Sequence, residues 1–304
     1  MASTKPSIGF VGVGAMGAPM AGCLIKAGYP LAVFDSNPDR TAAFARGHGV
    51  EPAATLAALG RDADVIITIL PNSAIVRDVL FGEQGLASSM RPGTVVIEMT
   101  SGIPSQTVAF SERLAAQGVV LFDAPVSGGV PRARTGELTI MAGGEKADID
   151  AAMPILNALG SVINTGEVGT GHAMKALNNL VSSAGFLIGV EALIIGSRFG
   201  IDPETMVDVL NVSTGMNNST QKKLKQYVLS RKFDSGFAMS LMVKDLTIAL
   251  GIAHENNVNA PFSDLCRNLW AGANAVLGQQ ADHTAIALLS EQLAGMQIGK
   301  PPKQ

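Results

Sequence analysis

This sequence of 304 residues contains two cysteines and has no excess of positive charge. The two cysteines, Cys23 and Cys266, are far apart, lack metal-ligand spacing and are too few for a disulfide framework, which favours a reducing, cytoplasmic location. The formal net charge is −3. Because nucleic-acid binding relies on clustered Lys and Arg that neutralise phosphates, nucleic acid is not an expected partner.

Signals for secretion and for membrane insertion are also missing. Residues 1–6 run directly into an apolar strand, without a separate hydrophobic region followed by a cleavage site. The longest segment without Lys or Arg, residues 176–197, contains Glu191, Asn178, Asn179 and several glycines and serines. A membrane span needs about 20 predominantly apolar residues, so we interpret this segment as a buried helix and expect no membrane partner. The four histidines share no spacing that would indicate a metal site.

Short apolar runs alternate with helical patterns in the first half of the chain. The expected strands are residues 7–11, 31–35, 64–70, 94–99 and 119–123, and the helices between them are 16–27, 38–46, 73–81 and 105–117. Continuously apolar strands that alternate with helices predict a parallel sheet covered on both faces. The fold class is therefore α/β, with a doubly wound domain over residues 1–166.

Helical patterns alone continue beyond that point, which predicts an all-helical domain over residues 167–304. The first of its helices, about 172–199, is long enough to span a small domain. It is apolar around nearly its whole circumference in residues 187–195, so other elements or another subunit must bury it. We expect oligomer contacts in this half.

A glycine-rich loop follows the first strand and opens the first helix. Its residues are Gly12, Val13, Gly14, Ala15, Met16 and Gly17. The first glycine permits a tight turn, the second lets the backbone approach a pyrophosphate, and the third allows close packing at the helix start. Free N–H groups and the positive end of the helix dipole then face the phosphates. This arrangement predicts a dinucleotide cofactor.

The end of the second strand indicates which dinucleotide is bound. Asp35 lies there and can accept hydrogen bonds from the adenosine ribose hydroxyls, whereas it would repel a 2′-phosphate. Ser36 follows it, and the nearest arginine is Arg40. NAD is therefore expected over NADP. The alternative role of Asp35 is that of a helix cap before Pro38.

Four blocks of sequence resemble the β-hydroxyacid dehydrogenase family, which includes 3-hydroxyisobutyrate dehydrogenase and tartronate semialdehyde reductase and is related to 6-phosphogluconate dehydrogenase. The blocks are residues 9–21, residues 123–129 continuing to 143–144, residues 169–179, and Lys244-Asp245-Leu246. The resemblance implies a Rossmann domain joined by a long helix to an all-helical domain. It also implies a homodimer or homotetramer that oxidises a small 3-hydroxy acid reversibly with NAD(P).

The resemblance assigns roles to residues of the third block. Lys175 matches the catalytic lysine of the family, and Asn179 matches its substrate-orienting asparagine one helical turn later. Asn178 occupies the position of a histidine in 6-phosphogluconate dehydrogenases. Alcohol oxidation removes a hydroxyl proton while hydride leaves carbon, so a general base assists, and a lysine amine can serve when burial reduces its affinity for protons. The alternative for Lys175 is a solvated helix residue.

Other positions are expected to contact substrate or cofactor. Ser127, Gly128 and Gly129 match the carboxylate-binding turn of the family, where a hydroxyl lies beside glycine N–H groups. Those expected from strand ends or from the resemblance are Thr100 for both ligands, Leu70 and Pro71 for the cofactor, Lys244 for both, and Phe237 for the substrate. Lys244 could instead pair with its neighbour Asp245, and Phe237 could be a core aromatic.

The segment 213–220 departs from the pattern of the family that the chain resembles, in which an arginine and an aromatic often follow the glycine. Its Asn217, Asn218 and Ser219 favour a polar acid over a branched aliphatic one. Two other functions stay open. One is an imine reductase, against which the presence of Lys175 argues. The other is a non-catalytic NAD-binding module.

Overall fold

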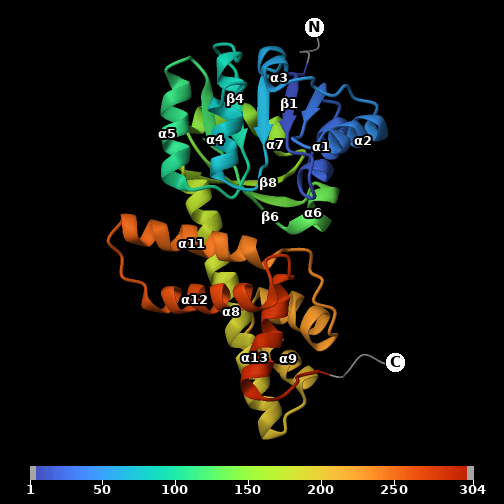
Figure 1. The fold of residues 1–304 in the computed structure, drawn as a ribbon, viewed down its shortest axis with the longest axis vertical. Helices are drawn as coiled ribbons and strands as arrows, with labels where there is room; N and C mark the ends of the chain where they lie inside the picture. The colour runs from blue at the N-terminus through green and yellow to red at the C-terminus, as the bar shows by residue number, and fades with distance from the viewer. Residues whose placement is uncertain (1–4, 300–304) are drawn as a thin grey trace. The chain divides into compact units, whose positions relative to one another are not determined.

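The computed structural model describes residues 5–299, and the chain divides into two compact units, Met1–Lys175 and Ala176–Gln304. Figure 1 shows the elements of both. The division falls within helix α8 (Thr170–Phe199), whereas the sequence places a domain boundary after residue 166. The first turn of this helix is tied to the sheet of the first unit by hydrogen bonds to Asp123, described below.

The first unit is built on a sheet in the order β2-β1-β3-β4-β5-β7-β6, with β8 paired to β7. Its strands are β1 (Ile8–Val11), β2 (Leu31–Phe34), β3 (Val65–Thr68), β4 (Val95–Glu98), β5 (Val120–Asp123), β6 (Val126–Ser127), β7 (Leu138–Gly143) and β8 (Gly160–Gly166). The pairs among β1 to β5 are all parallel. The predicted α/β class and its five parallel strands are confirmed.

Helices cover both faces of this sheet. They are α1 (Gly17–Lys26), α2 (Pro38–His48), α3 (Leu56–Asp62), α4 (Ser73–Phe81), α5 (Pro104–Ala115), α6 (Gly129–Thr135) and α7 (Lys146–Leu156), with a short 3₁₀ turn η1 (Leu86–Ser88). Asn37 begins α2, because its side chain accepts hydrogen bonds from Asp39 and Arg40. Asn72 caps α4 in the same way through Ile75.

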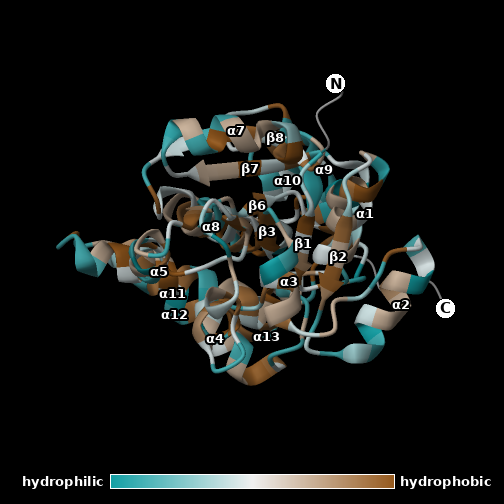
Figure 2. Ribbon diagram, turned by 90° about the horizontal axis from the view of Figure 1, so that it is seen from above, coloured by the Kyte–Doolittle hydropathy of each residue, from teal (hydrophilic) through white to brown (hydrophobic). Residues whose placement is uncertain are grey.

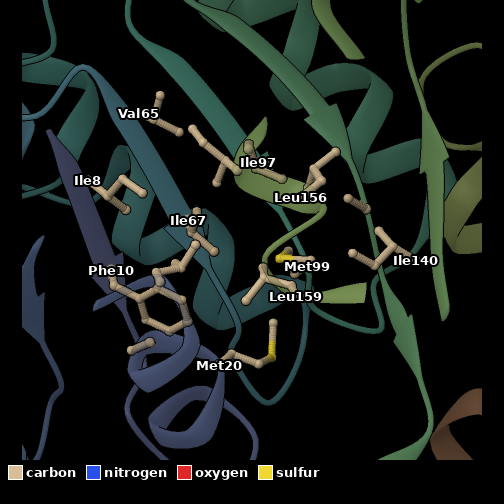
Figure 3. Packing of buried hydrophobic residues seen from close by; sticks show 14 of the residues in the cluster. Ile8, Phe10, Met20, Val65, Ile67, Ile97, Met99, Ile140, Leu156 and Leu159 are labelled. Carbon is tan, nitrogen blue, oxygen red and sulfur yellow. The ribbon is translucent and has the colours of Figure 1, made fainter. Parts of the chain in front are cut away.

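Alternate residues of each parallel strand point into two separate cores. Ile8 and Phe10 of β1 join Ile67 of β3 in the core under α1 and α7, which Figure 3 shows, whereas Val11 and Ile66 belong to the core under α3, α4 and α5. All four residues of β1 and of β3 are buried. Figure 2 shows these strands as hydrophobic. Because both faces of the sheet are buried, these strands appear in the sequence as continuous apolar runs and not as an alternating pattern.

The last three strands are absent from the sequence prediction, and two of their pairings are antiparallel. Strand β7 runs antiparallel to β5 and to β6, and parallel to β8. Strand β6 has only two residues, and β8 is largely exposed, so neither produces an apolar run. The sheet is thus mixed at this side, although the five strands that carry the cofactor loop are parallel.

The second unit is all-helical. It contains the rest of α8 together with α9 (Pro203–Asn211), α10 (Asn218–Lys222), a π-helical turn η2 (Leu224–Leu229), α11 (Met239–Glu255), α12 (Pro261–Leu277), a 3₁₀ turn η3 (His283–Ala285) and α13 (Ile286–Ala294). Helices α11 and α12 lie side by side (Figure 1). The core is formed around Trp270 and Phe186, both completely buried.

Helix α8 has one buried face and one exposed apolar face. Phe186, Val190 and Leu193 are completely buried in the core of the second unit. By length and composition this helix could cross a membrane, a property it shares with core helices. On the other face, Val181, Ile188 and Ile195 are 73%, 58% and 70% exposed. The fold of one chain therefore covers only part of the apolar surface that the sequence predicts for residues 187–195.

Candidate functional site

The glycine-rich loop has the geometry that a dinucleotide requires. Gly12 has a φ of +98°, and a Cβ on it would lie 2.4 Å from the carbonyl oxygen of Ile69. A Cβ on Gly17 would lie 1.8 Å from the carbonyl oxygen of Gly12. At Gly14, in contrast, a Cβ would meet nothing within 4 Å, so the protein itself does not demand a glycine there. This open space beside the start of α1 fits the close approach of a pyrophosphate.

Asp35 is joined to this loop by a hydrogen bond. Its Oδ2 accepts from the backbone N–H of Val13 at 3.0 Å, and its Oδ1 accepts from that of Asn37 at 2.9 Å. The cap of α2 is Asn37 and not Asp35. The carboxylate is therefore held beside the loop at the end of β2, where a ribose would lie.

The ends of β3 and β4 are joined through Thr100. Its hydroxyl accepts a hydrogen bond from the backbone N–H of Leu70 at 3.0 Å, and its side chain is almost completely buried. The structure thus brings together Leu70 and Thr100, two predicted contacts from strands that neighbour each other in the sheet. Pro71 follows directly at the same carboxyl edge.

A buried cluster of ionisable side chains, which the sequence did not predict, lies behind this edge. We call Glu98, Asp123 and His172 the buried acid–histidine cluster. His172 Nε2 lies 3.0 Å from Glu98 Oε2, and its Nδ1 lies 2.9 Å from the hydroxyl of Thr107. Glu98 Oε1 also accepts from the backbone N–H of Thr100 at 2.8 Å. All three members are at most 1% exposed, so His172 has a structural role.

Asp123 of this cluster caps the start of α8. Its two carboxylate oxygens accept from the backbone N–H groups of Gly169 and His172 at 2.6 and 2.7 Å. Burial raises the pKa of Asp123, while His172 and these two N–H groups lower it. Lys175 comes one turn after the capped N–H groups and is half-buried. The cluster therefore determines where the helix that carries Lys175 leaves the sheet.

The Ser127 turn connects β6 to α6. Gly128 and Gly129 have φ values of +134° and +67°, a region that other residues rarely adopt. A Cβ on Gly128 would lie 3.0 Å from the side chain of Arg132. Successive N–H groups in such a turn beside the half-buried Ser127 hydroxyl can bind an anion.

In the second unit a buried carboxylate holds two of the predicted residues together. Asp245, which is 2% exposed, accepts from the Asn179 amide at 2.5 Å and lies 2.8 Å from the Lys244 ammonium. Asn178 donates to the Asn179 amide oxygen at 3.1 Å. Lys244 thus makes the ion pair with Asp245 that the sequence left as an alternative. Because Asn179 and Lys244 both contact the Asp245 carboxylate, their side chains are held near each other.

Phe237 lies in a loop that Asp282 and His283 hold in place. Its ring packs edge-on against His283 with 5.6 Å between centroids, and its backbone N–H donates to Asp282. It is half-buried, so it contributes to the core of the second unit and still presents part of its surface.

The polar side chains of residues 217–219 have mainly local roles. Asn217 caps α10 by accepting from Ser219 and Thr220, and Ser219 is 1% exposed. Of the three polar residues that suggested a polar substrate, Asn218 alone is exposed. A helix start selects Asn and Ser for their hydrogen bonds, so these residue types do not by themselves indicate a polar substrate, and the polar acid stays a prediction.

Comparison with known proteins identifies the class that this loop and fold define. Residues 7–169 match the family model of the NAD-binding domain of 6-phosphogluconate dehydrogenase, and residues 169–290 match the NAD-binding model of NADP-dependent 3-hydroxyisobutyrate dehydrogenase. The chain is therefore an NAD-binding protein of the oxidoreductase type, and the predicted dinucleotide is confirmed.

The individual relatives narrow this class. A 2-(hydroxymethyl)glutarate dehydrogenase of Eubacterium barkeri is 35% identical over 96% of this chain and 97% of its own length. A 3-hydroxyisobutyrate dehydrogenase of Mycobacterium tuberculosis, solved with L-serine, is 28% identical with a TM-score of 0.87, covering 94% of this chain and 99% of that one. The chain belongs to the β-hydroxyacid dehydrogenase family.

An imine reductase of Myxococcus stipitatus is a more distant match. It is 19% identical with a TM-score of 0.64, covering 94% of this chain and 99% of that one, and this likeness shows a common fold alone.

Proposed function

We propose that this chain transfers hydride reversibly between NAD and a small 3-hydroxy acid, with Lys175 as general acid and base. The observation that carries the proposal is the construction of α8. Asp123 caps its first turn from the carboxyl edge of the sheet, and Lys175 follows on the same helix. One turn later Asn179 is held by the buried Asp245. Membership of the β-hydroxyacid dehydrogenase family supports the same reaction.

The reaction divides the work between the cofactor and the side chains. When bound, NAD supplies the acceptor for the hydride that leaves the hydroxyl carbon. Lys175 Nζ takes the hydroxyl proton in oxidation, and in reduction it returns that proton to the developing alkoxide. The Asn179 amide, whose orientation Asp245 determines, holds the substrate oxygen near this amine. The N–H groups of the Ser127 turn bind the substrate carboxylate.

The cofactor contacts follow from the loop geometry. Val13, Gly14 and Ala15 present backbone to the pyrophosphate at the start of α1, while Asp35 and Ser36 bind the adenosine ribose. Leu70 and Pro71 provide backbone to the cofactor beside Thr100, and the resemblance to the family assigns Lys244 of α11 a contact with cofactor and substrate. An acidic Asp35 supports NAD over NADP, because a 2′-phosphate would bring a second negative charge to a carboxylate.

A kinetic comparison tests the reaction and the role of Lys175. Reduction of NAD and NADP is measured with a panel of C3 to C5 hydroxy acids for the wild type, Lys175→Ala and the control Lys222→Ala, whose side chain is exposed. We expect Lys175→Ala to lower kcat on the best acid about 10²-fold or more, and Lys222→Ala to leave it unchanged.

Three results would contradict this proposal. Full kcat in Lys175→Ala would remove the lysine from the mechanism. NAD binding without turnover of any hydroxy acid would support the alternative, a non-catalytic NAD-binding module, and turnover of a cyclic imine alone would support imine reduction.

We also propose that the enzyme is a homodimer or homotetramer that acts in the cytoplasm. The exposed apolar residues Val181, Ile188 and Ile195, spaced by seven on α8, provide a surface that a second copy can cover. The free thiols of Cys23 and Cys266 support a reducing compartment.

A further inference from the structure

The buried acid–histidine cluster lies beneath two segments that the proposed reaction uses. Thr100, a proposed contact of the cofactor, comes two residues after Glu98, and Lys175 comes three residues after His172. The cluster itself is almost completely buried, so its side chains contact neither ligand. A side chain that holds both segments can nevertheless determine how they lie relative to each other.

Glu98 contacts both segments, one with each carboxylate oxygen. Its Oε1 accepts from the backbone N–H of Thr100 at 2.8 Å and from the Thr68 hydroxyl at 3.3 Å. Its Oε2 lies 3.0 Å from Nε2 of His172, in the first turn of α8. The end of β4 is thus connected through one side chain to the start of the helix that carries Lys175.

On the cofactor side, two hydrogen bonds join the loop after β4 to the loop after β3. The Thr100 hydroxyl accepts from the backbone N–H of Leu70 at 3.0 Å, and the backbone N–H of Ile103 donates to the Ser73 hydroxyl at 2.7 Å. A shift of Thr100 would therefore also move Leu70. Both are proposed contacts of the cofactor, so Glu98 supports this part of the site from below.

On the side of α8, the ring and the backbone of His172 are held separately. Its Nδ1 lies 2.9 Å from the Thr107 hydroxyl, which donates to the carbonyl oxygen of Ile103 at 3.2 Å. A Cβ on Gly102 would lie 2.8 Å from Cε1 of the ring, so a glycine is needed for this close packing. The backbone N–H of His172 donates to Asp123. The start of α8 is therefore held against the loop after β4.

We propose that Glu98 is a positioning residue for hydride transfer, which acts through Thr100 on the cofactor and through His172 on Lys175. This inference rests on the proposed oxidation of a hydroxy acid. In that reaction Lys175 takes the hydroxyl proton while hydride leaves the same hydroxyl-bearing carbon for NAD. Because both transfers require close approach and alignment, the amine and the cofactor must keep a fixed separation. Glu98 determines that separation without contacting either ligand.

Variants of similar shape test the two contacts of Glu98. Glu98→Gln keeps an acceptor oxygen for the Thr100 N–H but replaces the carboxylate oxygen that faces His172. His172→Asn keeps a polar group in the position of Nδ1 and lacks Nε2, whereas His172→Gln keeps a polar group in the position of Nε2. The control is Leu114→Ala, which creates a cavity at a completely buried residue of α5 outside the cluster.

The kinetic readouts are kcat, KM and the primary deuterium isotope effect on kcat, with the best acid deuterated at its hydroxyl-bearing carbon. We expect Glu98→Gln and His172→Asn each to lower kcat about 10- to 100-fold and to increase the isotope effect, with little change in KM for the acid. The double variant should lose no more than the weaker single one, because both changes break the same contact. His172→Gln should retain most of kcat.

A purely structural role of Glu98 gives a different result. It would lower only the fraction of folded protein, which calorimetry measures as the stoichiometry of NADH binding. The kcat per binding site and the isotope effect would then stay at the wild-type values, as we expect for Leu114→Ala. That result in Glu98→Gln would overturn the inference, and so would losses that add in the double variant.

Failure of this inference can be separated from failure of the proposed function. If the wild type turns over no hydroxy acid, the proposed function fails, and hydrogen–deuterium exchange then tests the coupling without turnover. NADH should slow exchange at residues 169–175 in the wild type and in Leu114→Ala but not in Glu98→Gln, while it slows exchange in the glycine-rich loop of all three. Slowing at residues 169–175 that is absent from the wild type, or equal in all three proteins, would overturn the inference.

Discussion

At the scale of single residues, burial changes the chemistry of ionisable groups most clearly at His283. It is 3% exposed, and it contacts the Lys223 ammonium, the Ser235 hydroxyl, Asp282 and the Phe237 carbonyl oxygen. Burial is the largest cause of its lowered pKa, followed by the charge of Lys223, whereas Asp282 raises it. The fold thus keeps His283 neutral, although the sequence predicts no role for this residue.

This neutral histidine predicts how stability depends on pH. In the unfolded chain the imidazole gains a proton as pH falls through about 6.5, whereas in the folded protein it does so only near pH 4. Between these values the unfolded state binds more protons, so the free energy of unfolding should fall with falling pH, by up to about 3 kcal/mol. Urea unfolding at pH 7 and pH 4.5 measures this loss.

The controls for this prediction are two histidine variants. His283→Gln should lose less stability than the wild type over the same pH interval, because it has no imidazole to protonate. His254→Gln, at an exposed position, should behave as the wild type does. Equal losses in all three proteins would show that other groups cause the pH dependence.

At the scale of elements, the buried acid–histidine cluster connects the ends of β4 and β5 to the first turn of α8. Glu98 comes from β4, Asp123 from β5 and His172 from α8. Each carboxylate also accepts from backbone N–H groups, Glu98 from Thr100 and Asp123 from Gly169 and His172. Such a cluster is favourable only while every member has its partners, since a buried charge left alone is strongly destabilising.

Removing one member should therefore affect stability far more than an exposed substitution of the same kind. Glu98→Leu leaves the His172 ring and the Thr100 N–H without their acceptor, and we expect a loss of about 3–5 kcal/mol in the free energy of unfolding. Glu98→Gln, which retains an acceptor oxygen, should lose less. The exposed control Glu112→Leu should stay within about 0.5 kcal/mol of the wild type. Chemical denaturation measures all three, and equal values for Glu98→Leu and Glu112→Leu would contradict the prediction.

At the scale of the whole molecule, the apolar surface of α8 exceeds what one chain covers. Val181, Ile188 and Ile195 remain 73%, 58% and 70% exposed. Their spacing of seven aligns them along one side of the helix. Exposed apolar residues aligned in this way are typical of an interaction surface and support the proposed homo-oligomer.

A charge placed on this face should prevent association. We expect Ile188→Glu to convert the oligomer to a monomer, because a carboxylate would be buried without a partner in the interface. Size-exclusion chromatography with light scattering measures the mass. The control is Ile163→Glu, which changes an exposed isoleucine of the first unit, 56% exposed, and should leave the oligomer intact. A wild-type monomer, or an oligomer that survives Ile188→Glu, would contradict this prediction.

The residues that could be predicted from the sequence share one property. Their roles depend on residues that are close to them in the chain. The glycine loop needs only its own φ values and the strand before it, and the parallel strands show as apolar runs because both of their faces are buried. Lys175 and Asn179 share a helical face by spacing alone. The strands β6 and β8 left no such signal, since β6 is two residues long and β8 is mostly exposed.

By itself the sequence determined the α/β class, the dinucleotide loop and the helix that carries Lys175, because periodicity and turn chemistry act between neighbours in the chain. Only the tertiary structure decided which distant groups meet. Glu98 and His172 are 74 positions apart in the chain, and Lys223 and His283 are 60 apart. Their contacts depend on how strands and helices pack, and packing is a property that no local pattern records.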